Sequence, residues 1–257
     1  MKTVILAGGM GTRFSEETSV RPKPMIEIGN KPILWHIMHT YSAYGQNEFI
    51  ICCGYKGHMI KDYFAHYYMY QSDVTFSVKD RKRTEHKNTA EKWRVTLADT
   101  GLRTLTAGRL LKIRTYLDGD DTFMLTYGDG VADVDIGALL AFHKSHGRIA
   151  TISTSQPEGR FGAIKISESG QVESFKEKAR RDQSWVNIGY MVFDARVFSY
   201  LGDGSEMLEA SPFERLASDG EMMAYRHQGF WSPMDTIRDK AYLEDLWESG
   251  KAPWKVW

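Results

Sequence analysis

The chain has 257 residues, of which 42% are hydrophobic and 26% are charged. This length and composition are typical of one globular α/β domain with a sizeable core. Lysine and arginine together number 33, as do aspartate and glutamate, so the formal net charge is zero. A balanced charge argues against nucleic acid or an anionic membrane as a partner.

The two cysteines, Cys52 and Cys53, are adjacent within an apolar run. Adjacent cysteines rarely pair with each other, so the sequence fits a reducing compartment. No apolar stretch approaches the roughly 20 residues that span a bilayer. The apolar start at residues 4–7 is too short for a signal peptide. We therefore expect a cytoplasmic protein.

The first half of the chain alternates expected strands with expected helices. Apolar runs without alternation indicate strands buried on both faces, and apolar residues at helical spacing follow them. We expect strands at residues 4–6, 49–53, 74–78, 94–97 and 122–127. We expect helices at 31–45, 59–67, 110–117 and 136–147. Asp135 or Asp133 can cap the last of these helices. Strand-helix repeats of this kind predict a parallel sheet with right-handed crossovers.

The second half has antiparallel features. Residues 161–166 and 172–176 flank Glu168-Ser169-Gly170, which is a hairpin signal. We further expect a strand at 186–193, a helix from a Ser211-Pro212 capping box to Gly220, a strand at 222–225 and a final helix at 236–249. The pattern predicts a single domain over residues 1–257, with a nucleotide-binding half at about 1–135 and a second half at about 136–257.

A glycine-rich segment, Leu6-Ala7-Gly8-Gly9-Met10-Gly11-Thr12-Arg13, directly follows the first expected strand. Three glycines in four positions let phosphate oxygens approach successive backbone N–H groups, and the guanidinium of Arg13 adds donors. Neither a P-loop nor a dinucleotide fingerprint fits, because no lysine follows Gly11 and the glycine spacing differs. A tight turn with an exposed arginine is the alternative.

Three charged residues are suited to phosphate chemistry. Lys23 lies between two prolines, so it is either a rigid donor to a transferring phosphoryl group or a solvated lysine. Asp129 lies between two glycines after a strand, where it can reach Mg²⁺ or simply form a turn. Asp235 precedes the last helix, so it is an N-cap, a second magnesium ligand or both.

Several further residues are weaker candidates. Lys178, next to Glu177, can hold a sugar phosphate or be a charge at the rim. Asn187 interrupts an apolar strand, so its amide needs a partner, which is either the substrate or the backbone. Arg109 opens a helix, where N–H groups favour an anion. The basic segment 79–94 is interpreted as a solvated surface or a subunit contact.

The tail at residues 252–257 is unusually aromatic for a terminus. We expect it to dock on the domain or on a neighbouring subunit. Together with the basic segment, this favours a homo-oligomer.

The glycine-rich segment, followed by Pro22-Lys23-Pro24-Met25 and later by Gly128-Asp129-Gly130, resembles the sugar-phosphate nucleotidyltransferases over nearly the whole chain. The resemblance implies a Rossmann-like three-layer αβα fold with a mainly parallel mixed sheet and a smaller antiparallel sugar-binding part. The stretches 50–57, 126–133 and 229–254 further imply CTP and glucose 1-phosphate as substrates and Mg²⁺ as cofactor. The product would be CDP-glucose, a precursor for deoxysugar and O-antigen synthesis.

The resemblance also implies roles for single residues. Leu6 to Arg13 would hold the triphosphate, Lys23 would bridge the reacting phosphates, and Asp129 and Asp235 would ligate magnesium. Thr104 or Thr106, Arg109 and Gly128 would contact the nucleotide, and Lys23, Glu177, Lys178 and Asn187 would contact the sugar phosphate.

The sequence departs from the family at two positions on the sugar side. Ala179 stands where the family usually has proline, and Ile188 stands where it often has glycine. A metal-dependent glycosyltransferase is the second hypothesis, although it would not need the glycine-rich segment with Arg13 and Lys23. A non-catalytic nucleotide-sensing domain is the third.

Overall fold

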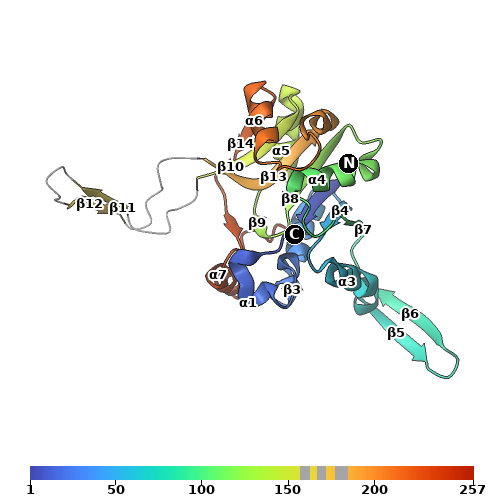
Figure 1. The fold of residues 1–257 in the computed structure, drawn as a ribbon. Coiled ribbons are helices and arrows are strands. Elements are labelled where there is room, and N and C mark those ends of the chain that lie inside the picture. The colour runs from blue at the N-terminus through green and yellow to red at the C-terminus, as the bar shows by residue number, and fades with distance from the viewer. Residues whose placement is uncertain (157–162, 167–171, 177–184) are drawn as a thin grey trace.

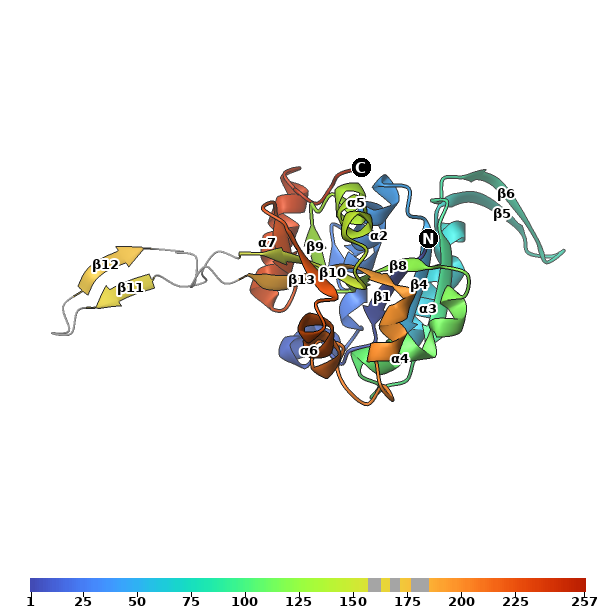
Figure 2. The same ribbon diagram turned by 90° about the horizontal axis from the view of Figure 1, so that it is seen from above.

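The computed structural model describes residues 1–156, 163–166, 172–176 and 185–257, with the backbone alone described for Arg13 and for the two short ranges. Its centre is a seven-stranded sheet (Figures 1 and 2). In spatial order the strands are β14 (Met222–Arg226), β10 (Ala150–Ser155), β13 (Val186–Asp194), β8 (Thr122–Tyr127), β1 (Thr3–Ala7), β4 (Glu48–Cys53) and β7 (Arg94–Asp99).

The sheet is mixed and mainly parallel, as predicted. Strand β13 runs antiparallel to both of its neighbours, β10 and β8, and the other four pairings are parallel. Strand β10 was not predicted from the sequence. Four of its six residues carry hydroxyl groups, and all four are buried or nearly so, which the apolar pattern cannot reveal (Thr151, Ser153, Thr154 and Ser155).

Helices cover both faces of the sheet, which gives the three layers. Successive residues of β1 belong to different cores: Val4 and Leu6 to one, Ile5 and Ala7 to the other, because side chains alternate along a strand. The core with Ile5 includes residues of α2 (Ile33–Ala43), α3 (Gly57–Tyr70), α5 (Ile136–His146) and α7 (Ile237–Glu248). The core with Val4 includes residues of α4 (Thr106–Lys112) and α6 (Ser211–Ser218).

Small antiparallel pairs surround the main sheet. They are β2 (Glu27–Ile28) with β3 (Lys31–Pro32), β5 (Ser72–Ser77) with β6 (Lys82–Asn88), β9 (Gly130–Ala132) with β15 (Trp231–Pro233), and β11 (Ala163–Ile166) with β12 (Val172–Lys176). Short helical turns complete the chain: α1 (Ser15–Thr18), η1 (Thr12–Phe14), η2 (Lys23–Met25), η3 (Arg114–Leu117) and η4 (Ala195–Tyr200). The β5–β6 hairpin extends away from the sheet in both views, and every residue of β6 is exposed.

The helix ends confirm one capping prediction and correct another. Asp135 caps α5, where its side chain accepts a hydrogen bond from the N–H of Ala138 at 2.8 Å, and Gly147 ends the helix at a φ of 64°. The capping box predicted at Ser211 is wrong. Helix α6 begins with Ala210 as its N-cap residue and has no side-chain cap, because Ser211 already lies inside the first turn.

The aromatic tail docks on the domain, which confirms one of the two predicted locations. Trp254 has no exposed surface, and its ring stacks on those of Phe230 and Trp247 at centroid distances of 5.6 and 6.4 Å. Its indole N–H donates to Nδ1 of His36 at 3.3 Å, and burial lowers the pKa of His36 to about 4. The residues after α7 therefore complete the core against α2. No described helix is long and apolar enough to cross a bilayer.

Substitution Trp254→Ala should lower the free energy of unfolding by about 3–5 kcal/mol, because it removes a fully buried ring and leaves a cavity. The matched control is Val256→Ala in the same tail, where the side chain is 38% exposed and the change should stay within about 0.5 kcal/mol. Urea unfolding followed by far-UV circular dichroism measures both. Equal stabilities for Trp254→Ala and wild type would contradict the docked tail.

Candidate functional site

A cavity of about 590 Å³ opens at the carboxyl ends of β1 and β8. Ligands of open α/β sheets bind at this edge. The cavity brings together most of the predicted site residues: Leu6, Ala7, Gly8, Gly9, Gly11, Lys23, Thr104, Thr106, Arg109, Gly128, Asp129, Asn187 and Asp235. Met10 and Thr12 do not line it. Glu177 and Lys178 lie outside the described residues, as does the side chain of Arg13.

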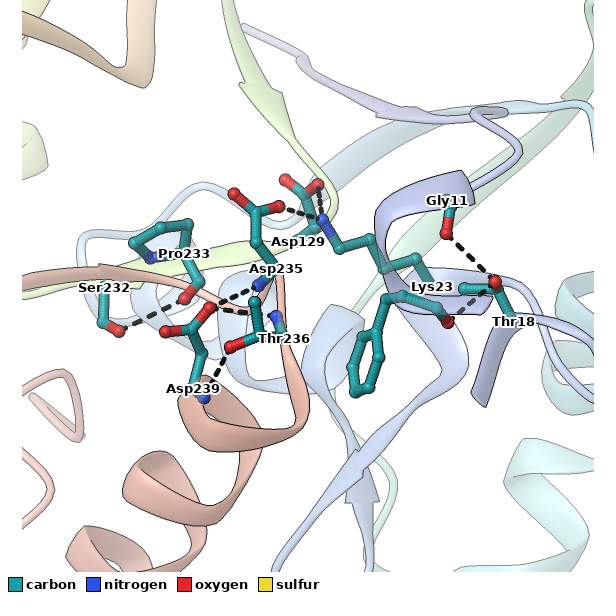
Figure 3. Close-up of polar contacts among 10 residues, drawn as sticks. Gly11, Thr18, Lys23, Asp129, Ser232, Pro233, Asp235, Thr236 and Asp239 are labelled. Carbon is teal, nitrogen blue, oxygen red and sulfur yellow. Dashed lines mark hydrogen bonds and ion pairs between the residues drawn. The ribbon is translucent and has the colours of Figure 1, made fainter. Parts of the chain in front are cut away.

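The glycine-rich loop is shaped by what packs behind it. A Cβ on Gly8 would lie 2.1 Å from the guanidinium of Arg109, and one on Gly11 would lie 2.6 Å from Thr18. The hydroxyl of Thr18 donates to the carbonyl of Gly11 at 3.0 Å, which holds the loop in its turn (Figure 3). Gly9 has nothing within 4 Å of its Cβ position. Gly8 and Gly11 are thus needed for packing, whereas Gly9 faces open space beside the cavity.

Arg109 is buried behind this loop. Its Nη2 donates to the carbonyl of Gly8 at 2.9 Å, and its Nη1 donates to Thr100 Oγ1, Gly101 O and Cys53 O at 2.5, 2.9 and 3.3 Å. Burial lowers the pKa of Arg109. The prediction that Arg109 opens a helix is wrong, because α4 begins at Thr106 and the N–H of Arg109 already donates to Leu105 O at 2.9 Å. The sequence also suggested a nucleotide contact, and the geometry adds a structural role. One guanidinium joins the loops that follow β1, β4 and β7.

Lys23 lies between two carboxylates. Its Nζ is 2.7 Å from Oδ2 of Asp129 and 2.5 Å from Oδ1 of Asp235 (Figure 3). The Lys23 side chain is 11% exposed. Burial alone lowers the pKa of Lys23, but the attraction and hydrogen bonds of the two carboxylates outweigh it and raise the pKa above its usual value. Lys23 therefore stays protonated at neutral pH, and the solvated-lysine interpretation is wrong.

The two carboxylates meet because their chain segments are paired. The N–H of Met234 donates to the carbonyl of Asp129 at 2.8 Å, next to the β9–β15 pairing. The N-cap interpretation of Asp235 is wrong. Thr236 caps α7 in a capping box with Asp239, whose carboxylate also accepts the N–H of Asp235 at 3.0 Å. Since Thr236 takes the capping role, the carboxylate of Asp235 is directed at Lys23 (Figure 3).

The carboxylates of Asp129 and Asp235 converge on one cation, here the ammonium of Lys23. Among the described residues, no group of three or more His, Cys, Asp or Glu could hold a metal ion. Magnesium in phosphate-transfer sites is usually held by one or two carboxylates, with substrate phosphates and water completing its shell. The acidic pair therefore fits a magnesium ion that also binds phosphates.

The cavity also contains a glutamate that the sequence analysis missed. Glu209 lines the cavity, where its carboxylate accepts hydrogen bonds from the hydroxyls of Tyr127 and Thr106, the latter at 2.7 Å. Tyr127 in turn accepts a long bond of 3.4 Å from the amide of Asn187. Glu209 precedes α6 in an irregular stretch with no motif, so no sequence signal points to it.

The structure also separates the two threonine candidates. The hydroxyl of Thr106 donates to Glu209 and accepts from the N–H of Leu208 at 2.7 Å, so its proton is already used. Among the described residues, the hydroxyl of Thr104 accepts a hydrogen bond from the ammonium of Lys112 at 3.2 Å. The hydroxyl proton of Thr104 therefore remains available for a ligand. Thr104 is therefore better placed than Thr106 to donate a hydrogen bond to a ligand in the cavity.

The region predicted to contact the sugar phosphate is described in part: Asn187 and Ile188 line the cavity, whereas Ala179 lies outside the described residues. The side-chain oxygen of Asn187 accepts the N–H of Gly189 at 2.9 Å, which confirms the backbone partner expected as one alternative. Ile188 is 3% exposed and lines the cavity, where a glycine would leave space.

Comparisons with known proteins identify relatives of this chain. The sequence profile of the family described as nucleotidyl transferase matches residues 2–244. Over the full length of both chains, the protein is 54% identical to glucose-1-phosphate cytidylyltransferase of Salmonella typhi. It is 43% identical to the probable glucose-1-phosphate cytidylyltransferase of Bacillus subtilis, again over both full lengths.

Two solved structures share the fold. HddC from Yersinia pseudotuberculosis superposes with a TM-score of 0.70 at 20% identity, over 96% of this chain and 99% of that one. UDP-glucose pyrophosphorylase in complex with UDP-glucose gives 0.68 at 16% identity, over 97% and 98%. The three-layer mixed-sheet architecture is thus shared with these two proteins.

Two neighbouring alanine substitutions should separate packing from ligand binding. Gly8→Ala should destabilise the protein by about 1–3 kcal/mol, because Arg109 or the loop must shift. Gly9→Ala should leave stability within about 0.5 kcal/mol but weaken CTP binding tenfold or more, because its methyl group blocks the approach of phosphate to the backbone. Thermal unfolding and isothermal titration with CTP measure the two effects. Wild-type CTP affinity in Gly9→Ala would contradict a phosphate cradle at this loop.

Proposed function

The chain belongs to the nucleotidyl transferase family, and from this premise we propose that it transfers the cytidylyl group of CTP to glucose 1-phosphate. The products are CDP-glucose and pyrophosphate. The substrate pair is supported by the 54% identity over full length to a relative with this named activity. The observation that carries the chemistry is the convergence of Lys23, Asp129 and Asp235 beside the glycine-rich loop.

The reaction is a single in-line displacement. A phosphate oxygen of glucose 1-phosphate forms a bond to the α-phosphorus of CTP. The bond from that phosphorus to the oxygen bridging to the β-phosphorus breaks, and pyrophosphate leaves with the electron pair. The attacking phosphate is already an anion, so the reaction requires no protein nucleophile. Catalysis by the protein then consists of positioning and charge stabilisation.

The residues of the cavity divide this work. The loop within the segment from Leu6 to Arg13 would hold the triphosphate, with backbone N–H groups exposed at its glycines, and Lys23 and Arg13 would stabilise negative charge at the α-phosphorus. Asp129 and Asp235 would hold a divalent cation, which we propose to be Mg²⁺. When bound, this cation offsets charge on the phosphates.

The remaining contacts are assigned by position in the cavity and by family resemblance. We assign Thr104, Arg109 and Gly128, which line the cavity, to the nucleotide, within a proposed nucleotide-binding half at about residues 1–135. We assign Asn187, which lines the cavity, to the sugar phosphate, within a proposed second half at about residues 136–257. Glu177 and Lys178 lie outside the described residues, and their proposed contact with the sugar phosphate is supported by family resemblance alone. Arg109 positions the phosphate-binding loop through its hydrogen bond to the carbonyl of Gly8.

The cellular setting of the activity is also proposed. A reducing, cytoplasmic compartment is supported by the two cysteines, which are adjacent in β4, buried and unpaired. The exposed β5–β6 hairpin supports a homo-oligomer, and family resemblance supports a role in deoxysugar and O-antigen synthesis.

A substrate matrix tests this assignment against the alternatives. Four nucleoside triphosphates are crossed with several sugar 1-phosphates, and pyrophosphate release is followed with and without a chelator. We expect the fastest release with CTP and glucose 1-phosphate, and its loss with the chelator. A metal-dependent glycosyltransferase would release no pyrophosphate, and a nucleotide-sensing domain would bind CTP without turnover.

Substitution Lys23→Ala should lower kcat at least a hundredfold, because loss of one donor to the transition-state charge costs about 3–4 kcal/mol by analogy with oxyanion holes. The control is Lys144→Ala on the exposed side of α5, which should leave kcat unchanged. Circular dichroism verifies that both variants fold. Near-normal turnover in Lys23→Ala would remove this lysine from the mechanism.

A further inference from the structure

The ammonium of Lys23 stands between the same two carboxylates that the proposed function assigns to a divalent cation. Each carboxylate gives one oxygen to it, at 2.7 Å for Asp129 and 2.5 Å for Asp235. A metal ion on those oxygens would lie within a few ångströms of the ammonium. Two cations this close, partly shielded from water, repel each other strongly. Lys23 in this position and a metal in the acidic pair are therefore mutually disfavoured.

The backbone of Lys23 is fixed, whereas its side chain can move. The N–H of Met25 donates to Pro22 O at 2.8 Å and that of Ile26 to Lys23 O at 3.1 Å, so the η2 turn is closed on itself. The ammonium, in contrast, is a point charge on a flexible stem, and Lys23 lines the cavity. Phosphate oxygens held by the glycine-rich loop would offer the ammonium a second set of acceptors without any backbone movement.

We propose that Lys23 is the resident cation of the Asp129–Asp235 pair and excludes free divalent metal until nucleotide phosphates draw its ammonium away. The proposal rests on the proposed function and deepens it. Lys23 neutralises the acidic pair in the empty site and stabilises phosphate charge in the filled one. Metal and nucleotide consequently enter together, and metal alone binds weakly.

A purely structural role of Lys23 predicts a different effect on metal affinity than competition with the metal does. If Lys23 merely packs beside the acidic pair, then removing its charge leaves metal affinity unchanged or weakens it through loss of structure. If Lys23 competes with the metal, then removing its charge strengthens metal binding in the absence of any nucleotide. The sign of the change in metal affinity therefore separates the two cases.

The test is titration of the nucleotide-free protein with Mn²⁺ alone, followed by electron paramagnetic resonance of the unbound ion. Lys23→Met should bind Mn²⁺ at least ten times more tightly than wild type, and Lys144→Met should bind it like wild type. Adding Asp129→Asn to Lys23→Met should abolish the gain, which assigns the ion to this pair. As a second readout, Mn²⁺ should raise the melting temperature of Lys23→Met more than that of wild type.

Equal or weaker Mn²⁺ binding by folded Lys23→Met would overturn the proposal. If Lys23→Met does not fold, Lys23→Gln removes the charge while keeping a polar side chain, and the same comparison applies. The substrate matrix is independent of this outcome. A wild-type enzyme that releases pyrophosphate, together with unchanged Mn²⁺ affinity in the variant, would contradict the competition and leave the transferase activity intact.

Discussion

The ionic contact of Lys23 with Asp129 and Asp235 fixes the centre of the site. Its members are separated by 106 and 212 positions in the chain, and they come from η2, the β8–β9 turn and the segment before α7. The carboxylates of Asp129 and Asp235 both contact the same ammonium, and they would repel each other without a cation between them. The contact therefore requires that the first and last parts of the chain fold against β8, and it sets the charge balance of the empty cavity.

The layout of the cavity follows from the sheet. Parallel strands β1, β4 and β8 have their carboxyl ends at the same edge of the sheet. The glycine-rich loop, the backbone carbonyls that Arg109 contacts and Asp129 therefore meet there without long connections. The donors of the glycine-rich loop and of Lys23 line the cavity, as does the carboxylate of Glu209. Preorganised donors of this kind suit a reaction in which charge builds on one phosphorus atom. Ile188 lines the cavity, where a glycine would leave more space.

The sequence predicted the parallel core and most of the cavity, because apolar runs and glycine spacing are local signals. It failed where the deciding partner is distant. Strand β10 is hydroxyl-rich and is a strand only because β13 and β14 flank it. Asp235 has the sequence position of an N-cap, but Thr236 and Asp239 form the capping box. Glu209 carries no motif, since its partners Tyr127 and Thr106 are distant in the chain.

The most direct test of the central claim is a crystal structure of the protein with Mg²⁺ and an unreactive CTP analogue. The account predicts metal density bridging Asp129, Asp235 and the phosphates, with Nζ of Lys23 moved from the carboxylates onto phosphate oxygens near the glycine-rich loop. A metal bound elsewhere, with Lys23 still paired to both aspartates beneath the bound nucleotide, would contradict it.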